Sequence, residues 1–266
     1  MRVAVWNMGH WSHREAHEEA WRWLLGELAP DIALLQECVP PPWVQAEREV
    51  LFQRAYPHGR QPWGTALVAE GLRTRPAELP EVQQWFDTLG EDPSRKCVAA
   101  RLAGWCVAAH VDLPGLPGAL VISLHNPAYH IDPHLLVGRD LAGIKLKLSK
   151  DVWLLDVLFS FLKTRLPSPL LIGGDFNYSR LLDEPKPRGN AEFFDRIAAE
   201  GFVSLHRLFH EGDQQTFFHP RRRRHQLDYL YASSSVAGLA KSCHMVSFAT
   251  IERFSDHVPI VAEFAT

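Results

Sequence analysis

Short apolar segments that end in polar residues are the feature that most constrains this fold. Residues 2–7, 31–37 and 169–175 are rich in aliphatic side chains and are too short for ordinary helices. The segment 31–37, DIALLQE, is apolar at consecutive positions, which is typical of a strand buried on both faces. Further strands are expected near 64–70, 95–102, 105–112, 119–125, 226–232, 243–249 and 257–264. The chain is therefore expected to build sheets that other layers cover.

Helical periodicity occupies the longer intervals between these strands. Ser12 and Glu15 have the spacing of a capping box, an apolar face follows, and Pro30 ends the pattern. Gly201 stands where a helix C-terminus favours glycine. The predicted helices cover about 12–29, 145–164 and 190–200. This order predicts a layered α/β arrangement with two sheets and helices on the outside.

Composition excludes several classes of protein. The 266 residues include 28 Lys and Arg against 31 Asp and Glu, a formal net charge of −3, with 46% hydrophobic and 22% charged residues. These fractions exclude a disordered, collagen-like or coiled-coil chain and a uniformly basic one. Because neither a repeat nor a low-complexity linker interrupts the pattern, residues 1–266 are expected to form a single domain.

The sequence has no feature of membrane insertion or secretion. The first residues lack the apolar core of a signal peptide, and the apolar stretch 152–162 is too short to span a bilayer. No membrane span and a cytoplasmic location are therefore expected. The four cysteines form no CxxC pair, which favours buried free thiols. A disulfide between Cys97 and Cys106 across a hairpin is the alternative.

Polar residues recur at the ends of the predicted strands. Each has an ordinary structural explanation by itself: an Asp in a turn, an Asn that caps a strand, or a His in a satisfied structural position. Strand ends on one edge of a packed sheet are nevertheless where a rigid scaffold presents catalytic groups. The residues in these positions are Asn7, Glu37, His125, Asp175, Asn177, Asp228, Asp256 and His257.

The neighbours of these residues carry a family resemblance. The matching pieces are VAVWN (3–7), APDIALLQE (29–37), SLHNP (123–127), LLIGGDFN (170–177), QTFF (215–218), QLDYLY (226–231) and SDHVPI (255–260). In these motifs the chain resembles the endonuclease/exonuclease/phosphatase superfamily, whose members share the fold of deoxyribonuclease I and exonuclease III. The resemblance implies a four-layer α-β-β-α sandwich of two packed, mostly antiparallel mixed sheets with outer helices. It also implies a phosphodiesterase that uses a divalent metal.

The resemblance assigns metal binding to three residues. Glu37 would be the principal metal carboxylate and Asn7 would lie beside it, while Asp256 would contribute to the same ion or to a second one. Carboxylate and amide oxygens suit a hard cation, so Mg²⁺ or Mn²⁺ is the expected cofactor. Such an ion polarises the phosphate and orients the reacting groups.

The resemblance assigns catalysis to five residues. Asp175 would deprotonate the attacking water, and Asn177 would hold Asp175 or the phosphate. His257 would stabilise the charge on a phosphate oxygen. His125 would be a second phosphate contact, and Asp228 would orient either His257 or His125, so both pairings stay open. Gly173 and Gly174 lead to a separate expectation. Because glycine has no side chain, these two residues are expected to let the substrate backbone approach closely.

Basic and aromatic residues precede the predicted strand at 226–232. Arg221, Arg222, Arg223 and Arg224 are expected to attract backbone phosphates, and Phe217 and Phe218 to meet a base or sugar. The favoured function is therefore a nuclease, acting on DNA more than on RNA. A small-molecule or lipid phosphoesterase, sphingomyelinase-like or inositol-phosphate-type, is the alternative, because phosphorylated small molecules also attract Arg.

Two further interpretations carry less support from the sequence. A non-catalytic binding module of the same fold would be expected to lose site residues, yet Glu37, Asp175, Asn177 and His257 are all present. In the cluster His10, His13 and His17, the last two are four residues apart and could share a helical face as zinc ligands would. Without a HExxH motif or nearby Cys, the histidines are expected to be exposed helix residues. The sequence indicates no oligomeric state.

Overall fold

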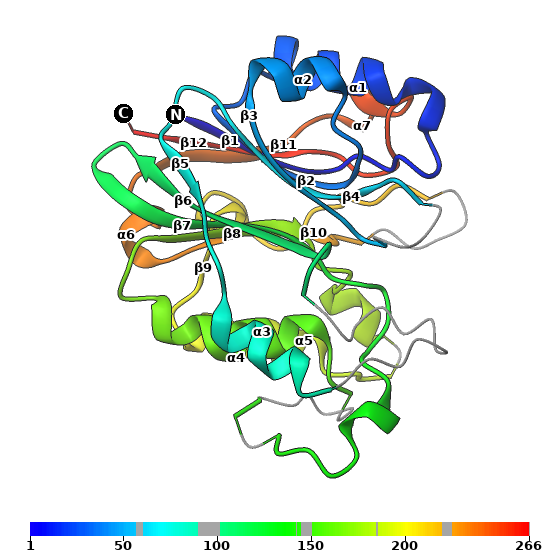
Figure 1. Cartoon of the computed structure of the whole chain (residues 1–266), viewed down its shortest axis with the longest axis vertical. Helices are drawn as coiled ribbons and strands as arrows, with labels where there is room; N and C mark the ends of the chain where they lie inside the picture. Colours follow the sequence, from blue (N-terminus) through cyan, green and yellow to red (C-terminus); the bar gives the residue numbers. More distant parts are fainter. Residues whose placement is uncertain are drawn as a thin grey trace.

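Two six-stranded β-sheets form the centre of the molecule, and helices cover their outer faces (Figure 1). The structure is a computed structural model, which describes residues 1–56, 61–89, 102–141, 143–144, 151–184, 186–219 and 225–265. The layers follow the order helix, sheet, sheet, helix. The fold class expected from the sequence is therefore confirmed.

The first sheet contains strands from both ends of the chain. In spatial order it consists of β11 (Ala240–Met245), β12 (Ile260–Phe264), β1 (Arg2–Asn7), β2 (Ile32–Cys38), β4 (Gly64–Ala69) and β3 (Glu49–Arg54). Its parallel pair is β1 with β2, and its other pairs are antiparallel. The carboxyl ends of β1 and β2 therefore lie at one edge of this sheet.

The second sheet repeats this arrangement with strands from the middle of the chain. In spatial order it consists of β5 (Thr74–Pro76), β6 (Cys106–Leu113), β7 (Leu116–His125), β8 (Leu170–Asp175), β10 (Asp228–Ala232) and β9 (Val203–Ser204). Its parallel pair is β7 with β8. Each sheet thus has one parallel pair at its centre.

Aliphatic side chains fill the space between the sheets, and aromatic side chains are frequent under the helices. Val5, Leu34, Leu171 and Leu230 belong to the buried cluster between the sheets. The first sheet is covered by α1 (His17–Trp23), α2 (Pro42–Glu47) and α7 (Phe248–Ile251), and the second by α3 (Pro80–Asp87), α4 (Leu154–Leu162) and α5 (Asn190–Ala199) (Figure 1). A short helix, α6 (Ser234–Ala237), follows β10. Burial on both faces explains the continuous apolar strands in the sequence.

Three boundaries differ from the sequence-based expectations. The predicted capping box is wrong: the Ser12 hydroxyl donates to the Gly9 carbonyl, and the first helix passes from a 3-10 turn at Arg14–Ala16 into α1 and then a π-turn at Leu24–Leu28. The second helix begins at Leu154, after an extended Trp153, and residues 145–150 of the expected helix lie outside the described residues. The segment 243–249 divides into the end of β11 and the start of α7. The strand expected at 95–102 lies almost wholly outside the described residues.

Cys38, Cys106 and Cys243 are free and buried, as expected, whereas Cys97 lies outside the described residues. Burial raises the pKa of the Cys106 thiol to about 12, so this thiol stays protonated and unreactive at neutral pH. Within the part of the chain that is described, no helix has the length and apolar character needed to cross a bilayer.

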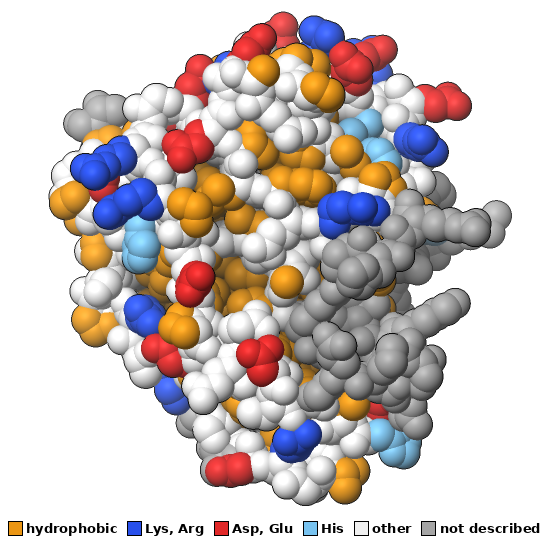
Figure 2. All heavy atoms as spheres, viewed as in Figure 1, with side chains coloured by type: hydrophobic (Ala, Val, Ile, Leu, Met, Phe, Trp, Pro, Cys, Tyr) orange, Lys and Arg blue, Asp and Glu red, His pale blue; other side chains and the backbone are white. Residues whose placement is uncertain are grey.

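The face seen in Figure 2 is hollowed between the edges of the two sheets. A groove of about 850 Å³ lies there, lined by β3, the segment from Pro76 to Asp87, and β6. None of the strand-end polar residues singled out in the sequence lines this groove. The candidate site therefore lies elsewhere, at the edge where the parallel strands end.

Candidate active site

The two parallel strand pairs deliver polar side chains to a common edge of the sandwich. Asn7 ends β1 beside Gln36 of β2, and His125 of β7 is the registered neighbour of Asp175 of β8. Asp228, the first residue of the antiparallel strand β10, also pairs with Asp175. The sequence-predicted residues are therefore brought together because each lies at the same end of its sheet.

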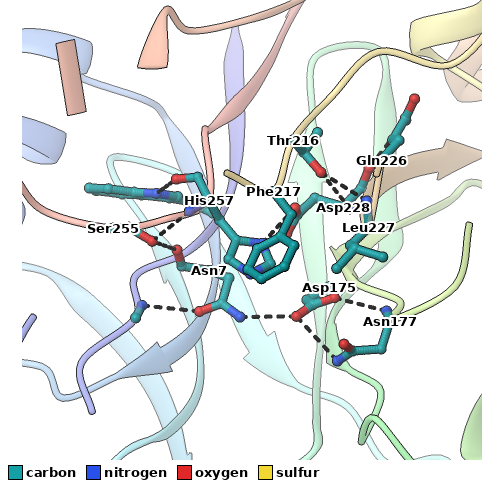
Figure 3. Close-up of polar contacts among 12 residues, drawn as sticks. Asn7, Asp175, Asn177, Thr216, Phe217, Gln226, Leu227, Asp228, Ser255 and His257 are labelled. Carbon is teal, nitrogen blue, oxygen red and sulfur yellow. Dashed lines mark hydrogen bonds and ion pairs between the residues drawn. The ribbon is translucent and has the colours of Figure 1, made fainter. Parts of the chain in front are cut away.

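A hydrogen bond joins the two sheets at this edge (Figure 3). The Asn7 side-chain amide donates to Asp175 Oδ2 at 3.0 Å. A second hydrogen bond also joins the two sheets. The side-chain amide of Gln36, the registered neighbour of Asn7, donates to the Ser123 hydroxyl of β7 at 3.0 Å. The relative position of the sheets is thus fixed by polar contacts next to the site.

Asp175 is a buried carboxylate that four contacts hold in place. Besides the Asn7 bond, Oδ1 accepts from the Asn177 backbone N–H at 2.8 Å, and Oδ2 accepts from the Asn177 amide at 3.3 Å. The backbone N–H of Asn126 donates to the Asp175 carbonyl at 2.8 Å. Burial, opposed by the nearby His257, raises the pKa of Asp175 to about 7. A carboxylate with such a pKa can exchange a proton near neutral pH.

Asn177 has a backbone conformation that few residues adopt. Its φ angle is 49°, in the left-handed region where Asn is tolerated better than most side chains. This turn points the amide back toward the strand ends, where it donates to the Asn126 carbonyl at 2.7 Å as well as to Asp175. Asn126 is a residue that sequence reasoning missed, although it follows His125 directly in the SLHNP motif.

Glu37 lies at an irregularity of β2. The pairing register with β4 shifts between Leu35 and Cys38, and Glu37 has a left-handed φ of 47°. Such a bulge turns a side chain away from the regular alternation of the strand. The Glu37 side chain is 14% exposed, and burial and the neighbouring Asp256 outweigh the effect of His257 and raise its pKa to about 7.

His257 and Asp228 form a buried ion pair. His257 Nδ1 lies 2.8 Å from Asp228 Oδ2 (Figure 3). Burial opposes the charge on His257, but Asp228, Asp175 and Asp256 outweigh it and raise the pKa of the imidazole to about 10. The two pairings that the sequence left open are thus resolved in favour of His257. His257 is the positively charged group of the site at neutral pH.

Two hydroxyls that sequence reasoning missed position this pair. The Thr216 hydroxyl accepts from the backbone N–H groups of Leu227 and Asp228, at 2.9 and 3.1 Å. The Ser255 hydroxyl accepts from the His257 N–H at 3.0 Å and donates to the Asn7 carbonyl at 2.7 Å. Both lie inside the QTFF and SDHVPI motifs, so a signal for them was present in the sequence.

His125 occupies a different environment from His257. Its Nε2 lies 3.7 Å from Glu37 Oε1 and 3.9 Å from Asp175 Oδ2, and its ring packs 5.0 Å from the Trp105 ring. Burial and the charge on His257 lower the pKa of His125 to about 3, so its ring is neutral at pH 7. Its buried Nδ1 has no hydrogen-bond partner among the described residues.

The expected role of the two glycines is wrong. A Cβ on Gly173 would lie 2.6 Å from Val5 Cγ2 of the facing sheet, and a Cβ on Gly174 would lie 1.7 Å from the Leu124 carbonyl oxygen of β7. Both positions make room for the protein itself. The close approach that they permit is between the sheets and between neighbouring strands, not between the chain and a substrate.

The aromatic residues expected to contact substrate are already packed. The Phe217 ring is 7% exposed and lies 4.8 Å from the His257 ring. The Phe218 ring stacks on Phe248 at 4.3 Å, and its backbone N–H donates to the Asp256 carbonyl at 2.7 Å. Arg221, Arg222, Arg223 and Arg224 lie outside the described residues.

The expectation that His10 and His17 are exposed helix residues is wrong. Both are buried, and their rings meet edge to face at 4.6 Å. His17 Nε2 accepts from the Trp21 indole and from the Val39 backbone N–H. Burial lowers the pKa of His17 to about 4. This ring is a structural acceptor between α1 and β2, which leaves its Nε2 no place as a zinc ligand.

The donor set at this edge fits a divalent cation. One ligand atom each from Asp175, Asp228 and His257 lies within 4.8 Å of the others, but the charged His257 is not available as a ligand, so Glu37 beside this cluster is the stronger candidate. The negative charge of Asp256 disfavours the charged form of Glu37. The imidazole nearest to Glu37 Oε1 is His125, whose ring is neutral. A buried carboxylate without a compensating charge is costly. A cation beside Glu37 would remove that cost.

A protein-family model described as "Endonuclease/Exonuclease/phosphatase family" matches residues 4–257. The chain belongs to the endonuclease/exonuclease/phosphatase family. It is thus a phosphoesterase-type protein of this family, whose model spans every strand-end residue described above. No curated protein sequence matches the chain.

Solved structures of endonuclease/exonuclease/phosphatase fold are similar in architecture at low sequence identity. An AP endonuclease from Archaeoglobus fulgidus matches with a TM-score of 0.65 and 18% identity over 100% of both chains. A 3′-5′ exonuclease from Neisseria meningitidis matches with a TM-score of 0.65 and 20% identity, also over 100% of both chains. A 3′ phosphatase from Neisseria, determined with a product DNA hairpin, matches at 0.65 and 18% over 100% of both. These similarities establish the fold.

Proposed function

We propose that this chain is a divalent-metal-dependent phosphodiesterase that hydrolyses nucleic acid, with DNA as the favoured substrate. The observation that carries the proposal is the juxtaposition of Asp175, Asp228 and His257 within 4.8 Å at the edge where both parallel strand pairs end. The family relationship and the DNA hairpin bound by the Neisseria 3′ phosphatase support it.

In this proposal Asp175 accepts the proton of the attacking water. The Asn7 and Asn177 bonds to its carboxylate hold one orientation, so little reorganisation is needed in the transition state. Asn177 therefore acts through Asp175. The raised pKa of Asp175 suits a base that works near neutral pH.

His257 supplies the positive charge. Because Nδ1 is directed at Asp228, Nε2 is the atom left to donate to a phosphate oxygen as negative charge develops. His125, with a neutral ring beside Asp175, is the proposed second phosphate contact. Both imidazoles thus lie on the route of a phosphate that reaches Asp175.

The residues proposed to hold the metal are Glu37, Asn7 and Asp256. Of these, Asn7 already directs its amide nitrogen to Asp175 and its oxygen to the Gly9 N–H, so Glu37 and Asp256 are the stronger candidates. Bound Mg²⁺ or Mn²⁺ would polarise the phosphate and offset the negative charge of the two carboxylates.

The experiment compares three phosphodiesters: supercoiled plasmid, duplex with an abasic site, and bis-p-nitrophenyl phosphate. Each is incubated with Mg²⁺ or Mn²⁺, and again with EDTA. We expect metal-dependent cleavage of the plasmid or the abasic duplex that EDTA abolishes. Cleavage of the small ester alone would favour a small-molecule or lipid phosphoesterase. No turnover with either metal would favour a non-catalytic binding module.

Variants test the assigned roles. Asp175→Ala and His257→Ala should each lower kcat by about 100-fold or more while leaving the thermal unfolding cooperative, since each removes a group that acts in the transition state. Asp87→Ala and His244→Ala change the same residue types on exposed surface away from the site and should keep wild-type rates. Wild-type turnover in either site variant would refute its role.

A further inference from the structure

Trp11 is an exposed indole attached to the candidate site. It is 66% exposed, the largest exposed fraction among the tryptophans of the chain. Its indole N–H, the only polar group of the side chain, acts on Glu37 and lowers the pKa of that carboxyl. The ring therefore lies beside Glu37 and most of its surface meets solvent.

The loop that carries Trp11 is fixed to the strand ends. The Gly9 N–H donates to the Asn7 side chain at 3.0 Å, and the His10 N–H donates to the Glu37 carbonyl at 3.0 Å. The Ser12 and His13 N–H groups both donate to the Gly9 carbonyl, which closes a turn around Trp11. A ring held in this way loses little conformational freedom when a ligand covers it.

The other aromatic side chains near the site offer less surface. The Phe217 ring is 7% exposed and packs on His257, and the Phe218 ring stacks on Phe248. Trp63 and Trp105, beside His125, are 9% and 2% exposed. A planar group bound next to Glu37 would therefore meet Trp11 in preference to these residues.

We propose that Trp11 is a stacking platform for an unpaired nucleobase next to the scissile phosphate, so that the favoured substrate is single-stranded nucleic acid or a strand with unpaired nucleotides. The proposal rests on the proposed function, because a phosphate at Glu37 brings the attached nucleotide within reach of the indole. A base inside a duplex has both faces covered by its neighbours, whereas an unpaired base can leave the stack and cover the ring.

The test measures binding as well as turnover. Fluorescently labelled oligothymidylate and an oligomer of the same length built from abasic deoxyribose phosphates carry the same charge and differ only in their bases. Binding of each is followed by fluorescence anisotropy with Mg²⁺, in proteins that also carry Asp175→Ala to slow cleavage, and cleavage is measured with Mg²⁺ in proteins that keep Asp175. Trp11→Ala should weaken oligothymidylate binding by about 5- to 150-fold, the range of base–aromatic stacking, and leave the abasic oligomer unchanged.

Two further variants separate the ring from its hydrogen bond. Trp11→Phe keeps an aromatic face and loses the N–H, so it should retain most of the thymidylate affinity. Phe209→Ala removes a ring that is 41% exposed at another place in the chain and should equal wild type. Equal losses in Trp11→Phe and Trp11→Ala would assign the effect to the bond with Glu37 and overturn the stacking role.

The remaining outcomes are distinct. Wild-type affinity of Trp11→Ala for oligothymidylate, or an equal loss for both oligomers, would overturn the stacking role while the nuclease function stands. A wild-type protein that neither binds nor cleaves any oligonucleotide, single-stranded or duplex, would overturn both. Cleavage of duplex in clear preference to the matching single strand would contradict the substrate class.

Discussion

Two site residues that are not glycine have left-handed backbone. Glu37 has a φ of 47° and Asn177 a φ of 49°. Asn adopts this conformation readily, whereas for Glu it is uncommon and costs on the order of 1 kcal/mol or more. The Met8 N–H donates to the Gln36 carbonyl, and the His10 N–H donates to the Glu37 carbonyl. These two hydrogen bonds hold the strained backbone at Glu37. The conformation aims a carboxylate that a regular strand would direct elsewhere.

Glu37→Gln should raise the unfolding free energy of the metal-free protein and lower its turnover with metal. The pKa of Glu37 rises from 4.5 in the unfolded chain to about 7 in the fold, so the folded state binds its proton more tightly. The unfolding free energy of wild type therefore falls as pH rises from about 4.5 to 7. Glu37→Gln does not show this fall, because a Gln side chain does not titrate. Denaturant unfolding in EDTA should show Glu37→Gln more stable than wild type above pH 7, by up to about 3 kcal/mol, and close to it at pH 4.

The matched control is Glu49→Gln, which changes an exposed carboxylate on β3 and should follow the wild-type pH curve. The same Glu37→Gln protein should lose most metal-dependent turnover. A variant that gains no stability between pH 4 and 8 would show that Glu37 has no raised pKa in the fold.

At this scale the sequence could identify most of the candidate site. Asn7, Glu37, Asp175 and His257 lie in motifs with recognisable neighbours. The histidine partner of Asp228 could not be predicted, because both histidines lie on the same edge of the sandwich. The two pairings are distinguished only by the distance of 2.8 Å from His257 Nδ1 to Asp228 Oδ2. The exposure of Trp11 could not be predicted, because it depends on a turn that local sequence does not specify.

At the scale of elements, the central parallel pair of each sheet explains where the polar residues meet. The pairs β1–β2 and β7–β8 end at one edge, and the antiparallel neighbours β12 and β10 begin there. Side chains from five strand ends and from the segment before β12 can therefore converge. This convergence explains why the site residues are buried and bonded to one another.

Gly173→Ala should disturb the site through the spacing of the sheets. The new methyl group would lie 2.6 Å from Val5 and 3.1 Å from Leu34, both on strands that lead into the site. Overpacking of this kind costs about 1–3 kcal/mol of unfolding free energy. Because Val5 is two residues from Asn7, the 3.0 Å bond from Asn7 to Asp175 should lengthen and kcat should fall as well.

Gly26→Ala is the matched control, because a methyl group there meets nothing within 4 Å. Its stability should equal or exceed that of wild type, since alanine is the better helix former. Thermal unfolding and kcat are measured on both variants. A fully active Gly173→Ala protein would show that the site tolerates a change of sheet spacing.

Elements were predicted well where burial dictates the pattern and poorly where tertiary contacts decide. The apolar strands at 64–70 and 119–125 and the helix at 190–200 match β4, β7 and α5 closely. Residues 151–153 of the helix expected near 145–164 are not helical, and there Trp153 is extended and packs against Tyr178. The glycines of β8 were assigned to the substrate because a sequence does not show the facing sheet.

At the scale of the whole molecule, charge is the remaining determinant of substrate choice. A formal net charge of −3 gives no general attraction to nucleic acid. Figure 2 shows acidic and basic side chains mixed over one face, with neither sign gathered on it. The run from Arg221 to Arg224 is therefore the sequence feature from which electrostatic binding of a polymer is expected. That a single domain spans residues 1–266 also stays a prediction.

Replacing Arg221 to Arg224 by Ala should weaken binding of polymeric substrates and flatten its salt dependence. Each lost phosphate contact lowers the slope of log affinity against log salt by about 0.9 on duplex DNA and about 0.7 on single strands. Turnover of bis-p-nitrophenyl phosphate should change little. The measurement is oligonucleotide affinity between 50 and 200 mM NaCl, salt concentrations at which such contacts show clearly. Equal losses on the polymer and the small ester would contradict a role in phosphate contacts.

The strand order of the first sheet has a consequence for protein synthesis. The β12 strand follows every other described strand in the chain, yet it pairs with β1, and His257 lies three residues before its first residue. A nascent chain on the ribosome can thus present Asn7, Glu37 and Asp175 long before it contains the imidazole that completes the set. Truncated translation products would therefore lack the charged group that the proposed hydrolysis needs.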